Sequence, residues 1–251
     1  MVLSAHPDDD VLGAATLLLR GPTVAVVQLT DGVPRAPRWR SPSAEAGEEG
    51  YRAQRRRESL EALAVAGLPA SALHALGGRD LESIDEAAAL ARRLATLVER
   101  VCPARLCTHP YEGGHPDHDT AALVARAALS LASAPVELRE MTSYHAGPGG
   151  ALEAGVFLPG VGVPEEVRVL APDERDAKRR MLAAHASQAA VLAQFSVDVE
   201  RFRPAPRHDF GRPPHPGPVL HELRGWGDGA RWRTRATDAL AELGLGSDGC
   251  R

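Results

Sequence analysis

The first residues that could do chemistry are a histidine and three consecutive aspartates near the start of the 251-residue chain. They lie in "SAHPDDDVLGAA", where His6, Asp8, Asp9 and Asp10 separate an apolar start from an apolar, helix-like run. One carboxylate is enough to cap a helix, whose N-terminus favours negative charge through its free N–H groups and its dipole. Because adjacent carboxylates repel one another, a run of three beside a histidine indicates that a cation, most simply a metal ion, is bound there.

A second motif, "HPDHD" at residues 115–119, repeats the His-Pro-Asp pattern. Both motifs fall at expected strand-to-helix junctions, which lie at one edge of a parallel α/β sheet, so the two segments can face each other across a single crevice. Three imidazole or carboxylate ligands with one open position are typical of a catalytic zinc site. Alone, the first motif could be a capped helix beside a core histidine, but the matching position of the second disfavours that alternative. The side chains that can meet are His6, Asp8, Asp9, His115, Asp117 and His118.

A β-α-β unit must position the first motif. We expect a buried strand in "MVLSAH", a helix in "DDDVLGAATLLLR" that is stopped by Gly21 and Pro22, and a second strand in the β-branched "TVAVVQLTDG". Such a unit implies a parallel sheet with its ligand site at the C-terminal ends of the strands.

The rest of the chain continues the alternation of helices and strands. No linker is long enough to separate two domains, so we expect a single domain over residues 1–251. Residues 33–50 lack an apolar period, and a loop of that length either covers the crevice or is plainly disordered. Residues 199–226 are Pro-rich and should be irregular. Helices are expected over 51–67, 83–101, 118–131, 173–195 and 230–243, and strands over 104–109, 136–144 and 165–170.

Composition excludes several classes of partner. The formal net charge of -4 offers no broad basic surface for nucleic acid, so a small-molecule partner is expected. No stretch approaches the ~20 apolar residues of a membrane span, and no signal peptide is recognisable at Met1, so we expect a cytoplasmic protein. Three cysteines are too few for a disulfide framework. The expected first strand begins almost at Met1, which leaves open whether native residues precede it, and a homo-oligomer also stays open.

The sequence resembles the LmbE-like or PIG-L family of metal-dependent deacetylases, which remove acyl groups from N-acetylglucosamine-type amines. The resemblance covers nearly the whole chain and implies the family's Rossmann-like three-layer α/β fold with a mainly parallel sheet. The segments that carry it are "AHPDDDVLGA", "LTDGV", "RRRESLEAL", "THPYEGGHPDHDTAA" and "HASQ". The first and fourth of these are specific, and the others support them.

The resemblance also implies a role for each residue of the two motifs. The general base is Asp8, the residue that stabilises the oxyanion or donates a proton is His115, and Asp117 orients that histidine. Asp10 stands where the family usually has glutamate, which shortens a helix-capping or supporting contact without removing a ligand. The implied ligands of the metal are His6, Asp9 and His118. Imidazole and carboxylate ligands without thiolate predict Zn²⁺, with another divalent ion such as Fe²⁺ as the alternative.

Other polar residues have less specific interpretations. Tyr111, beside His109, could contact a substrate carbonyl or simply pack in its loop. The arginines at 55–57 are explained mainly by i, i+4 pairing with glutamates, although one of them could turn inward. His185 of "HASQ" is expected in the core. We expect exposed or substrate-facing side chains, and no second metal site, for His208, His215 and His221.

The sequence is compatible with three functions. The leading hypothesis is a zinc-dependent hydrolase that removes an N-acetyl or other N-acyl group from an amino sugar in a glycoconjugate or natural product. The second is an amidase that cleaves a larger acyl group or a thiol-conjugate amide. The third, a non-catalytic nucleotide- or sugar-binding module, is disfavoured for nucleotides because three carboxylates occupy the turn where closely spaced glycines would cradle phosphate.

Overall fold

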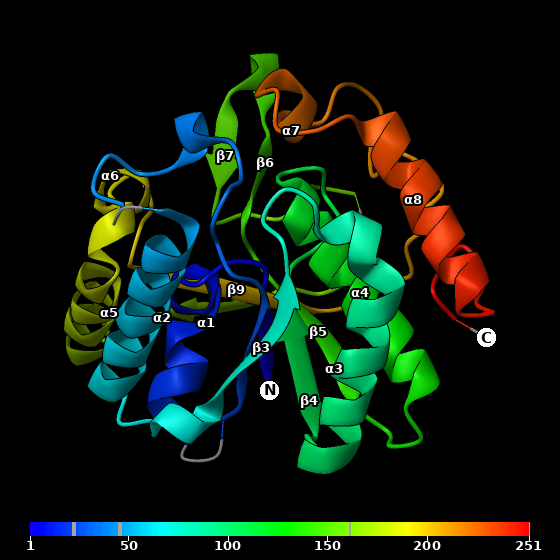
Figure 1. Ribbon diagram of the computed structural model, residues 1–251. Coiled ribbons are helices and arrows are strands. Elements are labelled where there is room, and N and C mark those ends of the chain that lie inside the picture. The colour runs from blue at the N-terminus through cyan, green and yellow to red at the C-terminus, as the bar shows by residue number, and fades with distance from the viewer. Residues whose placement is uncertain (22–23, 45–46, 161, 251) are drawn as a thin grey trace.

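The computed structural model describes residues 1–21, 24–44, 47–160 and 162–250, and over these residues seven strands form one sheet (Figure 1). The strand order is β3-β2-β1-β4-β5-β9-β8. The first five strands are parallel, and β9 and β8 continue the sheet in antiparallel pairing. The strands are β1 (Val2–Ser4), β2 (Val26–Thr30), β3 (Leu73–Gly78), β4 (Arg105–Thr108), β5 (Glu137–Met141), β8 (Glu166–Val169) and β9 (Val199–Pro204), with β6 (Tyr144–Ala146) and β7 (Leu152–Ala154) in a separate hairpin.

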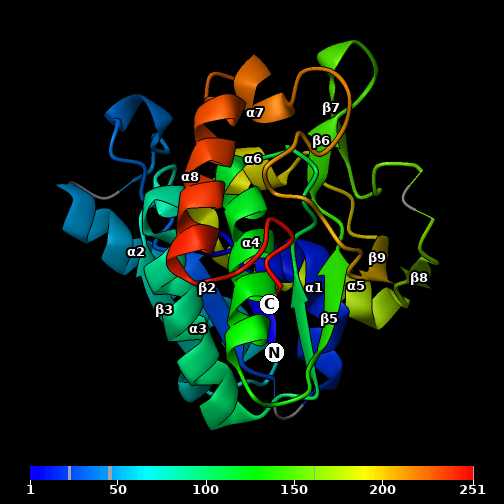
Figure 2. The ribbon, with the colours of Figure 1, turned by 90° about the vertical axis from the view of Figure 1, so that its right-hand side faces the viewer.

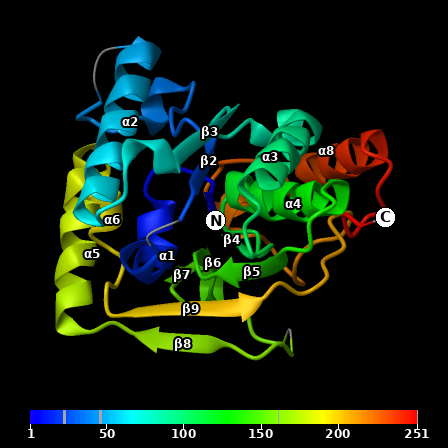
Figure 3. The ribbon, with the colours of Figure 1, turned by 90° about the horizontal axis from the view of Figure 1, so that it is seen from below.

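Helices cover both faces of the sheet, which confirms the expected three-layer α/β fold with a mainly parallel sheet. In Figures 1 and 3, α1, α2 and α5 lie on one face, and α3, α4 and α8 lie on the other. Within the described residues, no helix has the length and apolar character needed to cross a membrane. The helices are α1 (Asp9–Arg20), α2 (Gly47–Val65), α3 (Ala87–Val101), α4 (Pro116–Leu131), α5 (Pro172–Ala184), α6 (Ala189–Leu192), α7 (Leu220–Leu223) and α8 (Gly229–Glu242).

The apolar strands bury side chains on both faces because neighbouring residues of a strand point in opposite directions. Val2 and Val26 belong to a core cluster with α1, α2 and α5. Leu3 and Val27, their chain neighbours, belong to a cluster with α3, α4 and α8. The sheet therefore needs a helical layer on each side, as the β-α-β pattern predicts.

The order of the strands places a crevice above β1. From β1 the chain moves through β2 to β3 on one side, and β4 and β5 lie on the other side. The loops that follow β1 and β4 consequently diverge, and ligands of open α/β sheets bind at such a switch point. Figures 1 and 2 show the β6–β7 hairpin and α7 at this same end of the molecule.

Three expected segments differ from the structure, and two strands were not expected. The expected helix 173–195 ends at Ala184, because His185 leaves the helical conformation (φ -82°, ψ 56°) before two short turns follow. The expected irregular tail contains β9, an internal strand of the sheet. Strand β3 and the hairpin strand β7 were not expected at all. The loop 33–50 is shorter than expected, since α2 begins at Gly47, and residues 45–46 lie outside the described part of the chain.

Candidate active site and metal-binding residues

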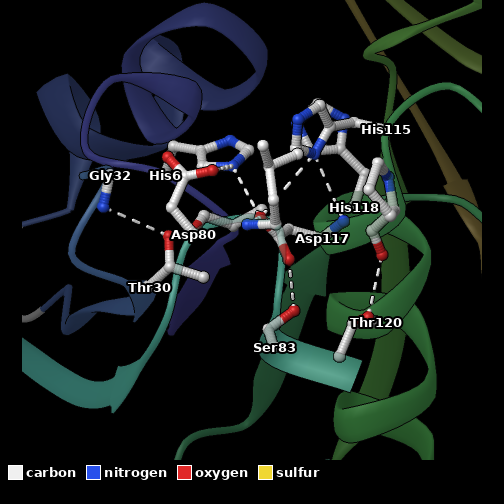
Figure 4. Close-up of polar contacts among 12 residues, drawn as sticks. His6, Thr30, Gly32, Asp80, Ser83, His115, Asp117, His118 and Thr120 are labelled. Carbon is white, nitrogen blue, oxygen red and sulfur yellow. Dashed lines mark hydrogen bonds and ion pairs between the residues drawn. The ribbon is translucent and has the colours of Figure 1, made fainter. Parts of the chain in front are cut away.

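Asp9 lies at the centre of the predicted site. The turn from β1 into α1 directs its carboxylate back toward His6, whose main-chain N–H donates to Asp9 Oδ2 at 2.8 Å. The same oxygen lies 3.1 Å from His6 Nδ1 and 3.4 Å from His118 Nε2, which α4 supplies. Asp9 thus contacts both of the other predicted ligands. The groups of ligand atoms that all lie within 4.8 Å of one another combine these residues differently: His6 with His115 and His118, and Asp9 with His109 and His118. Figure 4 shows His6 and His118 approaching each other from opposite sides of the crevice.

The imidazole of His118 has one ring nitrogen engaged and one free. Its Nδ1 lies 2.8 Å from the Ser143 hydroxyl. Its Nε2 is buried, faces Asp9, and has no hydrogen-bond partner among the described residues. A buried polar atom without a partner is costly, and a metal ligand whose other nitrogen is held by a neighbour is a common reason for one. His118 therefore fits a divalent cation held with His6 and Asp9.

His109 also lies close to Asp9, but its relevant nitrogen is occupied. Its Nε2 is 3.5 Å from Asp9 Oδ2, and its ring stacks on that of His118 at 4.0 Å. The main-chain N–H of Ala5 donates to this Nε2 at 3.0 Å. That hydrogen bond uses the lone pair of Nε2, so we assign His109 a supporting role. Its ligand atom nevertheless lies within 4.8 Å of those of Asp9 and His118.

Asp8 adopts a backbone conformation that is rare for a residue with a side chain, with φ at 139°. Non-glycine residues are strained at such positive φ values, and this strain is found most often at functional sites. The carboxylate points to Arg55, whose Nη2 lies 3.3 Å away and also donates to the Pro7 carbonyl at 2.8 Å. Burial raises the pKa of Asp8 to about 6, against the lowering effect of Arg55. Asp8 is thus placed to exchange a proton near neutral pH.

Arg55 is the inward-turning member of the arginine run, and a glycine makes room for it. Gly32 of "LTDGV" has φ at +64°, and a Cβ there would lie 2.7 Å from Pro7 and 2.9 Å from the Arg55 guanidinium. The "HASQ" segment supports the same helix, because Ser187 donates to Glu58 of α2 through its N–H and its hydroxyl. Gly32 therefore makes room for Arg55, and the "HASQ" segment contacts α2, the helix that carries Arg55.

His115 caps the N-terminus of α4 and lines the crevice. Its Nδ1 accepts the main-chain N–H of Asp117 at 3.2 Å, and its ring lies 4.6 Å from that of His6 and 5.2 Å from that of Trp226. Burial and the neighbouring His6 hold the pKa of His115 well below its usual range. A neutral ring with Nδ1 as acceptor carries its proton on Nε2, which suits a hydrogen-bond donor.

Asp117 contacts His6 more closely than the histidine it was expected to orient. Its Oδ2 lies 3.2 Å from His6 Nε2 but 3.8 Å from His115 Nδ1. The main-chain N–H of Leu81 donates to Oδ2 at 2.7 Å, and the Ser83 hydroxyl donates to Oδ1 (Figure 4). Although burial raises the pKa of Asp117, these hydrogen bonds and the nearby imidazoles hold it at about 2. Its carboxylate is thus placed to fix the ring of His6, while its main chain fixes His115.

The third aspartate of the run stays apart from the other two. Asp10 is buried, and its Oδ1 has no hydrogen-bond partner within the described ranges. Burial, together with the charge of Asp8, raises its pKa to about 7. It lies in the first turn of α1, as expected for a helix-end residue.

Asp80 is a buried carboxylate of the site that sequence reasoning missed. Its Oδ1 lies 3.9 Å from His6 Nε2, and burial raises its pKa to about 7. Ligand atoms of Asp80, His6, His115 and Asp117 all lie within 4.8 Å of one another, so this group is a further candidate cation cluster beside the two that contain His118. The available signal was an acidic residue directly after a strand, but strand β3 was itself not expected.

A cavity of about 320 Å³ opens beside these residues. Asp8, Asp9, Asp80 and His115 lie on its wall, and part of the loop 33–44 reaches it. Gly114 allows the second motif to approach, because a Cβ there would lie 1.9 Å from the Tyr144 carbonyl oxygen. The aromatic side chains that line the cavity are Trp39, Tyr51, Tyr144, Phe195 and Trp226.

The remaining candidate residues lie outside this cavity. Tyr111 packs on Trp232 at 5.3 Å and donates to the Arg212 carbonyl, so it is a packing residue. His185 is buried, as expected. Across the described residues, none of the tail histidines joins a candidate metal group. Contrary to expectation none of the three is exposed or lines the cavity, and His221 is buried. Their polar contacts include Glu140 for His208, the Pro216 carbonyl for His215 and Asp119 for His221.

Several solved structures with the same fold are described as deacetylases. A deacetylase of teicoplanin biosynthesis, solved as a complex with bog, superposes with a TM-score of 0.60 at 20% identity, covering 81% of this chain and 96% of that chain. The N,N'-diacetylchitobiose deacetylase of Pyrococcus horikoshii gives 0.57 at 18% identity, with 77% and 72% covered. The 4-carboxy-2-hydroxymuconate hydratase GalB of Pseudomonas putida KT2440 gives 0.52 at 15% identity, with 80% and 93% covered. At these identities the likeness concerns the fold.

A comparison with curated proteins gives no match. The family model described as PIG-L, GlcNAc-PI de-N-acetylase, matches residues 1–129, which is just over half of the 251 residues and includes both His-Pro-Asp motifs. The chain therefore belongs to the PIG-L family.

Proposed function

We propose that this protein is a metal-dependent hydrolase that removes an N-acetyl or other N-acyl group from an amino sugar in a glycoconjugate or small natural product, with residues 1–251 as one catalytic domain. The observation that carries the proposal is the unpartnered, buried Nε2 of His118, which faces Asp9 Oδ2 at 3.4 Å beside an open cavity. Membership of the PIG-L family and the deacetylases among the structural neighbours support it.

His6, Asp9 and His118 would hold the cation, leaving room for water and substrate. The donor set of two imidazoles and one carboxylate favours Zn²⁺, with Fe²⁺ as the alternative, and one similar deacetylase structure is described as a zinc-inhibited form. A divalent cation bound there lowers the pKa of water and polarises an amide carbonyl. Asp117 fixes the ring of His6 and Ser143 fixes that of His118, as neighbours of metal-binding histidines commonly do.

The chain's own residues supply the proton transfers. Asp8 is the general base, since Arg55 holds its carboxylate at the cavity wall and its raised pKa suits proton exchange near neutrality. His115 donates a hydrogen bond or a proton to the reacting group from Nε2, because its Nδ1 is occupied. Asp80, on the wall of the cavity, accepts hydrogen bonds from sugar hydroxyls, and the aromatic residues around it contact the faces of the sugar rings.

The fold also supports another reaction, since the structural neighbours include a hydratase. The two functions differ in product, so the test measures products directly. We would incubate the protein, loaded with Zn²⁺ or Fe²⁺, with N-acetylglucosamine, N,N'-diacetylchitobiose and glycosides of N-acylglucosamine. Equal amounts of free acid and free amine are expected, and His118→Ala should release neither. Release of neither product by the wild type from any N-acyl amino sugar would contradict the proposal.

A further inference from the structure

A second cavity, of about 420 Å³, adjoins the first and shares Asp9, Leu12, Tyr144 and Phe195 with it. The rings of Tyr144 and Phe195, whose centroids are 5.9 Å apart, therefore form a wall between the two spaces. The second cavity, which we call the rear chamber, is further bounded by β7, by the residues after α6 and by β9. Through Asp9 the rear chamber reaches the proposed metal-binding residues.

Two contacts tie the rear chamber to the reacting centre. Asp9 lies on its wall as well as on that of the first cavity. Ser143, which also lines it, is hydrogen-bonded to His118 at 2.8 Å. The rear chamber therefore borders the proposed reacting centre.

About half of the residues that line the chamber are polar. Thr142, Ser143, Gln194 and Ser196 offer hydroxyl and amide groups. Arg201 of β9 adds a positive charge, and its guanidinium is only loosely paired with Glu165, at 3.6 Å. The volume exceeds what the methyl group of an acetyl would fill, and the lining suits a polar ligand better than an alkyl chain.

We propose that the rear chamber binds the acyl half of the substrate and that the preferred acyl group is longer than acetyl and ends in a carboxylate, as succinyl does. This inference rests on the proposed function. An amide at the reacting centre has two substituents, and two cavities meet at Asp9, so the amine half occupies the aromatic-lined cavity and the acyl half occupies the chamber. Arg201 then faces the terminal carboxylate of the acyl group.

The chemistry of the step is that of any amide hydrolysis. Water adds its oxygen to the acyl carbon, the carbon–nitrogen bond breaks, and protons of the water pass to the departing amine. The products are a free amino sugar in the first cavity and a dicarboxylate in the chamber. No oxidant or other co-reactant is needed.

The test compares N-acetyl-, N-butyryl- and N-succinylglucosamine, of which the last two have acyl chains of equal length. We expect kcat/KM for the succinyl compound to exceed that for the butyryl compound by about 10-fold or more, as a charged hydrogen bond contributes. Arg201→Gln should remove most of this preference. If acetyl is cleaved and succinyl is not, the inference is wrong while the proposed function stands; if no compound is cleaved, both are wrong.

A matched pair of variants in β7 tests the location independently. Leu152 and Ala154 line the chamber, whereas Glu153 between them does not. Ala154→Phe should lower the ratio of succinyl to acetyl cleavage about 10-fold by filling the space, and Glu153→Phe should leave that ratio unchanged. An equal effect of the two variants, or an unchanged ratio in Ala154→Phe, would show that the acyl group lies elsewhere.

Discussion

At the scale of single residues, the hydrogen bonds of the ring nitrogens differ between the histidines around Asp9. His118 keeps Nε2 free and engages Nδ1 with Ser143, whereas His109 spends its Nε2 on the main-chain N–H of Ala5. His6 divides its two nitrogens between Asp9 and Asp117. The positions of the two motifs predicted that these residues could meet. They did not predict which ring nitrogen has which partner, because Ser143, which contacts His118, and Leu81, which contacts Asp117, lie in distant loops.

The hydroxyl of Ser143 should therefore matter for metal binding. In Ser143→Ala, the His118 ring loses the partner that fixes its orientation, so the Kd for Zn²⁺ should rise about 10-fold. Competition with a chromophoric chelator measures this directly. Ser133→Ala, at an exposed position, is the control, and equal Kd values for Ser143→Ala and wild type would contradict the role given to Ser143.

At the scale of elements, the helix that carries the three aspartates is bent. Ala14 of α1 leaves the helical conformation (φ -143°, ψ 25°), which frees main-chain groups on either side. Lys178 of α5, the only lysine in the chain, donates to the Leu12 carbonyl at 2.6 Å, and Glu200 of β9 accepts from the Thr16 N–H at 3.1 Å. Lys178 and Glu200 also pair with each other at 2.8 Å, and both are fully buried. This pair therefore fixes the bend behind the active-site turn.

Removing one member of the pair should be costly. Lys178→Met leaves the buried charge of Glu200 without its partner, so the free energy of unfolding should fall by about 3–5 kcal/mol. Urea unfolding followed by circular dichroism gives the value. The control is Arg179→Met, at the next residue, which breaks the exposed pair of Arg179 with Asp176. It should lower the free energy of unfolding by less than about 1 kcal/mol. Equal losses would mean that the buried pair has no special role.

The loop before α2 supplies part of the cavity wall, as its length suggested. Trp39 and Pro34 line the cavity, and Trp39 keeps 39% of its surface exposed. Trp39→Ala should raise KM about 2- to 10-fold through loss of aromatic contact, with kcat little changed. Steady-state kinetics on the best N-acyl amino sugar provide the test. Leu223→Ala, an exposed apolar control outside the cavity lining, should change neither constant, and an unchanged KM in Trp39→Ala would remove this loop from substrate binding.

Local sequence patterns predicted the strongly apolar strands and helices. They missed strands whose formation depends on pairing with distant segments. The first β-α-β unit was predicted because its strands are continuous apolar runs. Strand β9 lies in a Pro-rich stretch with alternating charges, and it forms because β5 and β8 pair with it on either side. Strand β3 has six residues but ends in two glycines, which are uncommon in strands. Asp80 was overlooked for this reason, since its position is informative only when the strand before it is recognised.

At the scale of the whole molecule, a buried charge network connects the second motif to the C-terminal part of the chain. Arg203 of β9 donates to Glu140 at 2.7 Å and to Glu112 at 3.0 Å, and His208 lies 2.8 Å from Glu140. The N–H of Leu158 also donates to Glu112. The network explains His208 as a structural residue and joins the loop that carries the second motif to β5 and β9.

This network should make stability depend on pH. Burial raises the pKa of Glu112 to about 7, against the lowering effect of Arg203, whereas an unfolded glutamate titrates near 4.3. The folded state therefore binds the proton of Glu112 more tightly than the unfolded state does. The stability that this proton contributes is lost as pH rises through about 7. The free energy of unfolding of Glu112→Gln, minus that of the wild type, should therefore increase by at most about 3 kcal/mol from pH 5 to pH 8. Urea unfolding at both pH values tests this, with the exposed Glu137→Gln as control. A difference that does not grow with pH would contradict the raised pKa.

The three adjacent aspartates are proposed to have separate roles, as base, metal ligand and helix-end residue. The most direct test measures metal content and kcat in Asp8→Asn, Asp9→Asn and Asp10→Asn. Asp9→Asn should lose both metal and activity, because its charge holds the cation. Asp8→Asn should keep the metal and lose about 10²–10⁴ in kcat through loss of the base, and Asp10→Asn should have the mildest effect. If Asp8→Asn loses the metal while Asp9→Asn retains it, the roles are exchanged, and if both variants remain fully active, the protein is not the hydrolase proposed.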